Sequence, residues 1–94
     1  MKQKTTHKEQ FDALRRIEGQ VKGIQRMVES EKYCIDILIQ MYAAINALSR
    51  VSEDIFVKHI EGCVQSAFTH GSKGEKSKKI QEIIAVLKLK RKLR

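Results

Sequence analysis

Apolar residues recur every three or four positions along most of this 94-residue chain, and this spacing places them on one side of an α-helix. The first such stretch ends at about Glu29. Its apolar face is formed by Leu14, Ile17, Val21, Ile24 and Val28. Thr6 and Glu9 have the spacing of a capping box, in which each side chain accepts a hydrogen bond from the backbone N–H of the other residue. The helix is therefore expected to start there.

The longest stretch with this pattern covers residues 33–69, which contain no proline and one glycine, Gly62. It predicts a single long helix, entered through a turn at residues 30–32. Gly71 is suited to the left-handed conformation that often follows a helix end. A third helix is then expected from about residue 75 to residue 90. Its apolar face is formed by Ile80, Ile83, Ile84 and Leu87.

The composition agrees with an all-α protein, since there is no proline and 41% of the residues are hydrophobic. We expect a single helical domain spanning residues 1–94, with a mobile tail at residues 1–5 and a basic tail at residues 88–94. A chain this small would bury more apolar surface in its core if it formed an oligomer. Two cysteines without a signal peptide fit the reducing cytoplasm. No membrane span is expected, because no stretch approaches the roughly 18 apolar residues that one needs.

Three candidate metal ligands share one side of the long helix. His59 and Cys63 are four residues apart, so one helix can bring them to the same ion. Cys34 lies about 43 Å from Cys63 at the helical rise per residue. A second copy, packed antiparallel about a two-fold axis near Ala47 and Leu48, would bring Cys34 of one chain to the pair on the other. The alternative is that both cysteines are small core residues and the histidine is hydrogen-bonded in the core.

The net charge of +8 favours a polyanionic partner, with nucleic acid as the leading candidate. On the first helix, Lys22 and Arg26 lie within about 20° of Arg15, nearly opposite the apolar face. Arg16 is the neighbour of Arg15, and Arg50 is the only basic residue between Cys34 and Val57. The predicted DNA-binding residues are Arg15, Arg16, Lys22, Arg26 and Arg50. A basic surface kept for solubility, and cations that stabilise a helix C-terminus in the final tail, are the competing explanations.

No enzyme signature is present: the chain has no Gly-rich phosphate loop, no Gly-x-Ser-x-Gly and no His-Glu-x-x-His. We therefore expect neither catalysis nor a small-molecule substrate. A helix-turn-helix reader is also not expected, because the second helix is too long and too apolar to serve as a recognition helix.

Three segments together resemble the CsoR family of metal-responsive repressors, which includes RcnR and FrmR. They are LRRIEGQVKGI at residues 14–24, YCIDILIQ at residues 33–40 and His-x-x-x-Cys-Val at residues 59–64. The resemblance implies a three-helix protomer and a dimer that forms an antiparallel four-helix bundle. It also implies a dimer of dimers that binds double-stranded operator DNA without a helix-turn-helix.

The resemblance also assigns roles to residues. In the copper-sensing branch, Cu(I) is held by a Cys of one protomer and a His and a Cys of the other, which correspond to Cys34, His59 and Cys63. Tyr33 and Glu82 match residues that couple metal binding to DNA release, although the loop before Glu82 is longer here, at residues 72–75. Arg15 and Arg50 match basic positions implicated in DNA binding. His7 could correspond to a ligand of the nickel branch, but that branch has His in place of Cys63.

The expected function is therefore a cytoplasmic Cu(I)-sensing transcriptional repressor that binds operator DNA as the apo protein and releases it on binding Cu(I). The alternative is a persulfide- or redox-sensing repressor that uses Cys34 and Cys63 across the subunit interface. That branch of the family lacks a histidine at the position of His59. A structural nucleic-acid-binding bundle without a ligand is a third interpretation.

Overall fold

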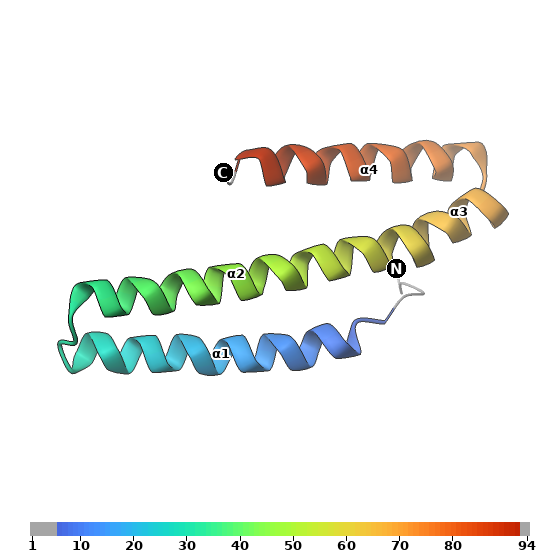
Figure 1. Cartoon of the computed structure of the whole chain (residues 1–94). Coiled ribbons are helices and arrows are strands. Elements are labelled where there is room, and N and C mark those ends of the chain that lie inside the picture. Colours follow the sequence, from blue (N-terminus) through green and yellow to red (C-terminus); the bar gives the residue numbers. More distant parts are fainter. Residues whose placement is uncertain (1–5, 93–94) are drawn as a thin grey trace. The chain divides into compact units, whose positions relative to one another are not determined.

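The computed structural model describes residues 6–92, and these are helical apart from two short turns (Figure 1). No strand occurs among them, so the predicted all-α class is confirmed. The elements in chain order are α1 (Lys8–Glu29), α2 (Cys34–His59), the π-helical turn η1 (Ile60–Val64), α3 (Gln65–His70) and α4 (Lys73–Lys92). Because α2, η1 and α3 follow one another without a break, the chain has the three helical segments expected from the sequence.

The described chain divides into two compact units. Residues 6–57 form one unit, and residues 58–92 belong to the other. In the first unit α1 and α2 run side by side, and Ile17 of α1 is buried together with Ala44 and Val51 of α2 (Figure 1). Ala44 and Val51 are seven residues apart, about two helical turns, so the apolar periodicity that predicts α2 also places both on one face of this small core.

The start of α1 differs from the prediction. His7 occupies the N-cap position, makes no capping hydrogen bond through its side chain, and accepts the backbone N–H of Phe11 on its carbonyl at 2.9 Å. The capping box at Thr6 and Glu9 is therefore wrong: the helix begins one residue later than that box requires. Glu9 still lies in the first turn, where its carboxylate interacts favourably with the positive end of the helix dipole.

The predicted turn between α1 and α2 is confirmed, and its hydrogen bonds fix where α2 begins. Lys32 N–H donates to the Met27 carbonyl at 3.0 Å and Glu31 N–H donates to the Val28 carbonyl at 3.2 Å, the pair of bonds that defines a Schellman motif. Glu31 takes the left-handed conformation, with φ of 57°, that a glycine usually provides. This turn delivers Cys34 to the first position of α2.

The long helix is not uniformly α-helical. At η1 the backbone N–H of Gln65 points to the carbonyl of Ile60, five residues earlier, as well as to that of Gly62. A π turn contains more residues than an α turn. Side chains after it are therefore rotated around the helix axis relative to the positions predicted for a regular α-helix. The prediction of one long helix is confirmed for the backbone path but is wrong for the register after Ile60.

The turn before α4 also corrects the sequence analysis. Gly71 is extended, with φ of −87° and ψ of 163°, and is not left-handed. Glycine is needed there for space: a Cβ atom would collide with the Ala67 carbonyl oxygen and lie 2.8 Å from a carboxylate oxygen of Glu75. Ser72 precedes the first residue of α4 and caps the helix, since its Oγ accepts the backbone N–H of Glu75 at 3.2 Å. The helix consequently begins earlier than expected, at Lys73, and includes most of the basic tail.

Few large side chains are buried in the described chain. Exposed fractions range from 41% to 61% for Leu38, Met41, Tyr42, Ile45 and Leu48, which recur along α2. Apolar side chains at this spacing normally face a core, and each buried one contributes about 1.5–3 kcal/mol. One chain by itself therefore leaves a face exposed that has the composition of an interior.

The helical stretch from Cys34 to His70 contains an 18-residue window with a mean hydropathy of 1.2, enough by length and composition to cross a membrane. The expectation that no stretch approaches this limit is therefore wrong. The same composition belongs to a helix at the centre of a soluble bundle, which needs apolar residues all round to pack against several neighbours.

Candidate metal centre and nucleic-acid interface

Cys34 lies in the unit formed by residues 6–57. It is the first residue of α2, and its thiol is free and exposed. Tyr33, beside it in the turn, is 69% exposed. The turn residues determine this position, because the Tyr33 carbonyl accepts the N–H of Ile37 at 3.2 Å and so begins the helix. A soft sulfur donor is thus presented at a helix end.

His59 and Cys63 lie in the unit formed by residues 58–92. His59 is the last residue of α2 and Cys63 belongs to η1, and both side chains are half-buried. Four residues are close to one full turn in an α-helix and in a π-helix, so the two side chains remain on one side of the backbone. The sequence analysis missed the π turn that joins them, for which Gly62 within an otherwise glycine-free helix is the available signal.

Among residues 6–92 no group of three His, Cys, Asp or Glu side chains is placed to hold a metal ion. The chain supplies an imidazole and a thiol on adjacent turns and a second thiol in the other compact unit.

Glu82 lies in α4 and is half-buried. One of its carboxylate oxygens is 3.7 Å from Nζ of Lys79, one turn earlier. Its side chain is 41% exposed, and an ion pair of this kind contributes about 0–1 kcal/mol, so little free energy holds the carboxylate in place.

The basic residues predicted on α1 are all exposed: Arg15, Arg16, Lys22 and Arg26. The Arg15 guanidinium lies 6.0 Å from the ring centre of Phe11, one turn earlier, at the outer limit of a cation–π contact.

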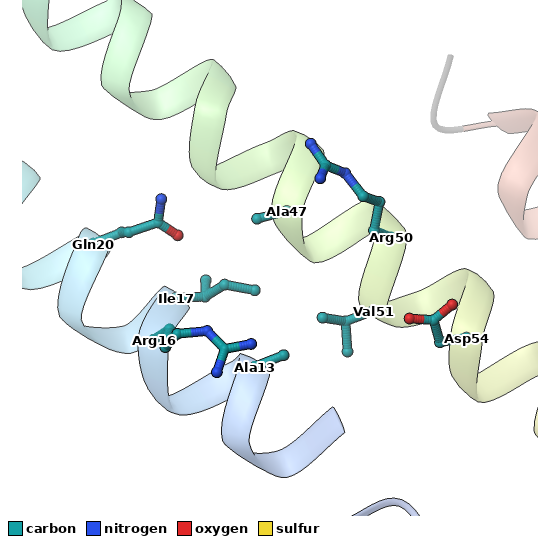
Figure 2. A pocket seen from close by; sticks show the side chains of 8 residues that line it. All are labelled: Ala13, Arg16, Ile17, Gln20, Ala47, Arg50, Val51 and Asp54. Carbon is teal, nitrogen blue, oxygen red and sulfur yellow. The ribbon is translucent and has the colours of Figure 1, made fainter. Parts of the chain in front are cut away.

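A groove of about 500 Å³ lies between α1 and α2 within residues 6–57 (Figure 2). Its lining includes Arg16 and Arg50, which the sequence analysis proposed separately and from different helices, and Figure 2 shows their guanidinium groups pointing in different directions. Figure 2 shows Arg16 reaching from α1 toward α2, where Asp54 lies one turn beyond Arg50. The complete lining is Ala13, Arg16, Ile17, Gln20, Ala47, Arg50, Val51 and Asp54. The sequence analysis missed Gln20 and Asp54, because assigning them requires knowing which turns of the two helices face each other.

Comparison with known proteins places this arrangement in a family. Residues 6–89 match the family model described as metal-sensitive transcriptional repressor. The copper-sensing transcriptional repressor RicR of Mycobacterium tuberculosis is 42% identical over 83% of this chain and 81% of its own length. The copper-sensing transcriptional repressor CsoR of Bacillus subtilis is 44% identical over 80% of this chain and 71% of its own length.

Solved structures have the same fold. The copper-sensing repressor CsoR with Cu(I) from Geobacillus thermodenitrificans superposes with a TM-score of 0.80 at 38% identity, covering 87% of this chain and 82% of that one. The nickel-responsive transcriptional regulator InrS gives a TM-score of 0.71 at 28% identity, covering 90% of this chain and 94% of that one. These relatives are transcriptional regulators rather than enzymes, and this chain belongs to the family of metal-sensitive transcriptional repressors, the CsoR/RcnR family.

Proposed function

We propose that this protein is a cytoplasmic Cu(I)-sensing repressor that binds operator DNA without metal and releases it when Cu(I) binds. The observation that carries the proposal is the donor set of two thiols and one imidazole in a chain whose most similar relatives include copper sensors. Two thiolates and one imidazole form a soft set that suits Cu(I), whereas structural zinc takes four ligands.

In the proposed site, Cys34 of one subunit joins His59 and Cys63 of its partner. One observation supports this arrangement: the α2 face between the donors is exposed and apolar. An antiparallel pairing that crosses near Ala47 and Leu48 would bury that face and create two identical sites. The resulting dimer is a four-helix bundle of α1 and α2 from both chains, and two dimers form the DNA-binding tetramer. Bound Cu(I) would link the two subunits.

DNA is proposed to lie against the exposed cations of the first unit: Arg15, Arg16, Lys22, Arg26 and Arg50. Contacts to phosphates supply most of the attraction of such a surface, and they need no recognition helix. A long apolar α2 is then explained by packing within the bundle, and the protein works at DNA in the cytoplasm instead of spanning a membrane.

Release requires that Cu(I) bind the DNA-free form more tightly than the DNA-bound form. The difference is a coupling free energy, typically about 1–3 kcal/mol. Tyr33, next to Cys34, and Glu82, on α4, are proposed to link the metal to that change. Glu82 is suited to the role because its exposed contact with Lys79 is weak and can be exchanged for another partner.

One observation favours a second candidate signal. The Cys34 thiol is exposed, as a thiol that reacts with persulfide or oxidant must be. In this alternative Cys34 and Cys63 of facing subunits become covalently linked, and the linked protein releases DNA.

The deciding experiment is a titration of the reduced protein with Cu(I), with operator-duplex binding followed by fluorescence anisotropy. We expect one Cu(I) per subunit to bind tightly and the DNA to be released over the same range. A protein that releases DNA with polysulfide but not with Cu(I) would support the sulfur alternative and refute the copper proposal.

A further inference from the structure

We propose that Phe11, on α1, reads the operator sequence by packing its ring against the methyl group of a thymine in the major groove of DNA. This inference rests on the proposed DNA-binding function and deepens it. Contacts between cations and phosphates hold a protein on DNA but carry no information about sequence. A repressor that distinguishes its operator from other DNA therefore also has to read base edges or DNA shape.

Phe11 lies on the basic side of α1. At about 100° per residue, Lys8, Lys22 and Arg26 lie within about 20° of Arg15, and these four residues form a basic stripe. Phe11 lies about 40° from Arg15, at the edge of this stripe, and about 100° from the centre of the apolar face of the helix. The packing of that apolar face therefore does not explain a phenylalanine at this position.

The ring of Phe11 is open to solvent. The residue is 59% exposed, and it is the only aromatic residue of α1. The Arg15 guanidinium, one turn later, lies 6.0 Å from the ring centre. A cation for a phosphate and an apolar ring are thus presented side by side on one helix surface. Packing the ring against an apolar group of the DNA would remove apolar surface from water and so favour the complex.

The chemistry of the DNA grooves identifies the group that the ring contacts. The major groove admits an α-helix, whereas the minor groove is too narrow for one. A phenyl ring has no hydrogen-bond donor or acceptor, so it does not pair with the polar atoms of the base edges. The C5-methyl of thymine is the apolar group that the base pairs present in the major groove, and a phenylalanine can read it by contact. The basic stripe would hold the helix at the phosphates that border the groove.

The test removes the thymine methyl group and leaves the charge and the base pairing of the DNA unchanged. A duplex is selected from a random pool by the metal-free parent protein, and each thymine in turn is replaced by uracil, which lacks only the methyl group. At the contacted thymine, uracil should weaken binding by the parent about fourfold, because one methyl group loses its apolar contact. Phe11→Ala should bind the thymine and uracil duplexes equally. Fluorescence anisotropy measures each affinity.

The same variant separates sequence reading from attraction to phosphates. Phe11→Ala should weaken binding of the selected duplex about tenfold but bind a duplex of random sequence within about twofold of the parent, since its cations are unchanged. The log–log salt slope should stay that of the parent, because no phosphate contact is lost. Phe68→Ala, which removes the 42% exposed ring of α3, is the matched control and should keep the parent's preference for the selected duplex. Circular dichroism should show the same helix content in all three proteins.

The outcomes separate this inference from the function it rests on. A parent protein insensitive to uracil at every thymine, or a Phe11→Ala variant that keeps the parent's sensitivity, would overturn the reading of thymine and leave the repressor proposal intact. Equal losses on the selected and random duplexes, together with dissociation of the oligomer in analytical ultracentrifugation, would place the ring at a contact between copies of the chain and also overturn it. Failure of the parent to bind any duplex at low salt would refute the proposed function itself.

Discussion

The two compact units of the chain differ in regularity and in chemistry. Residues 6–57 form two uninterrupted α-helices that bury Ile17, Ala44 and Val51 and carry the basic groove. Residues 58–92 contain a π turn, the six-residue α3 and a turn at Gly71 without room for a side chain. DNA contacts are proposed for the regular unit only, whereas the proposed metal donors are divided, with Cys34 in one unit and His59 and Cys63 in the other. Substitutions should therefore separate DNA binding from metal sensing.

The largest effect is expected from the cysteines, one in each unit. Cys34→Ala and Cys63→Ala should each abolish tight Cu(I) binding, because only one soft thiolate and one imidazole remain, while DNA binding by the metal-free protein persists. Cu(I) titration against a chelator of known affinity measures this.

Mixed dimers make the test specific to a site shared between chains. A dimer of one Cys34→Ala chain and one Cys63→Ala chain should keep a single intact site, since one interface retains all three donors. A mixed dimer without any tight site would refute the shared arrangement.

His59 tests whether the irregular unit transmits the metal signal. His59→Ala should weaken Cu(I) binding and remove copper-dependent DNA release, because two thiolates alone favour linear coordination and the imidazole no longer links the metal to its surroundings. DNA-binding anisotropy with Cu(I) and then with polysulfide measures both signals. Release by copper that matches the parent would contradict the role of His59, and release by polysulfide alone would favour the sulfur alternative.

The same contrast limits what the sequence could predict. The apolar period of 3.6 residues predicts α1, α2 and their connecting turn, because each apolar position there faces one side of a regular helix. The apolar period could not predict η1. There the backbone N–H of Gln65 points to the carbonyl of Ile60, five residues earlier instead of four, and this change in backbone hydrogen bonding has no counterpart in the side-chain composition. Gly71 was assigned the wrong role because close approach to Ala67 depends on the path of the chain, which a left-handed glycine rule does not describe.

The candidate site shows a similar division. Each arginine was predicted as a cation on a helix face, but the presence of Arg16 and Arg50 in the lining of one groove depends on which turns of α1 and α2 are opposite each other. The metal ligands Cys34, His59 and Cys63 remain predictions, because the proposed site draws on a second chain. The sequence thus identifies candidate side chains by their type and their position on a helix, whereas it does not predict which side chains of different helices lie close together.

A charge change in the regular unit should affect DNA binding alone. Arg15→Ala or Arg50→Ala should weaken operator binding about tenfold and reduce the log–log salt slope by up to about one unit, with Cu(I) affinity unchanged. Anisotropy at several salt concentrations measures both quantities. Parental DNA affinity in both variants would remove the proposed binding face.

Two glycines provide a matched test of the irregular unit. Gly71→Ala should destabilise the protein by about 1–3 kcal/mol, since its Cβ has no room beside Ala67. Gly74→Ala, in the first turn of α4, meets nothing closer than 3.9 Å and should stabilise by up to about 1 kcal/mol. Urea unfolding followed by circular dichroism measures both, and equal stabilities would contradict the steric role of Gly71.

The smallest expected effect concerns the only carboxylate that lines the groove. Asp54→Asn should tighten duplex binding about two- to fivefold at low salt, because it removes a negative charge from the groove that the proposed DNA-binding residues Arg16 and Arg50 also line, while keeping the size of the side chain. The gain should fade as salt rises, since Asp54 is exposed and its interactions are screened. Asp36→Asn, on the same helix but outside the groove, makes the same change in net charge. An equal gain from both variants would show that net charge, rather than the position of Asp54, sets the effect.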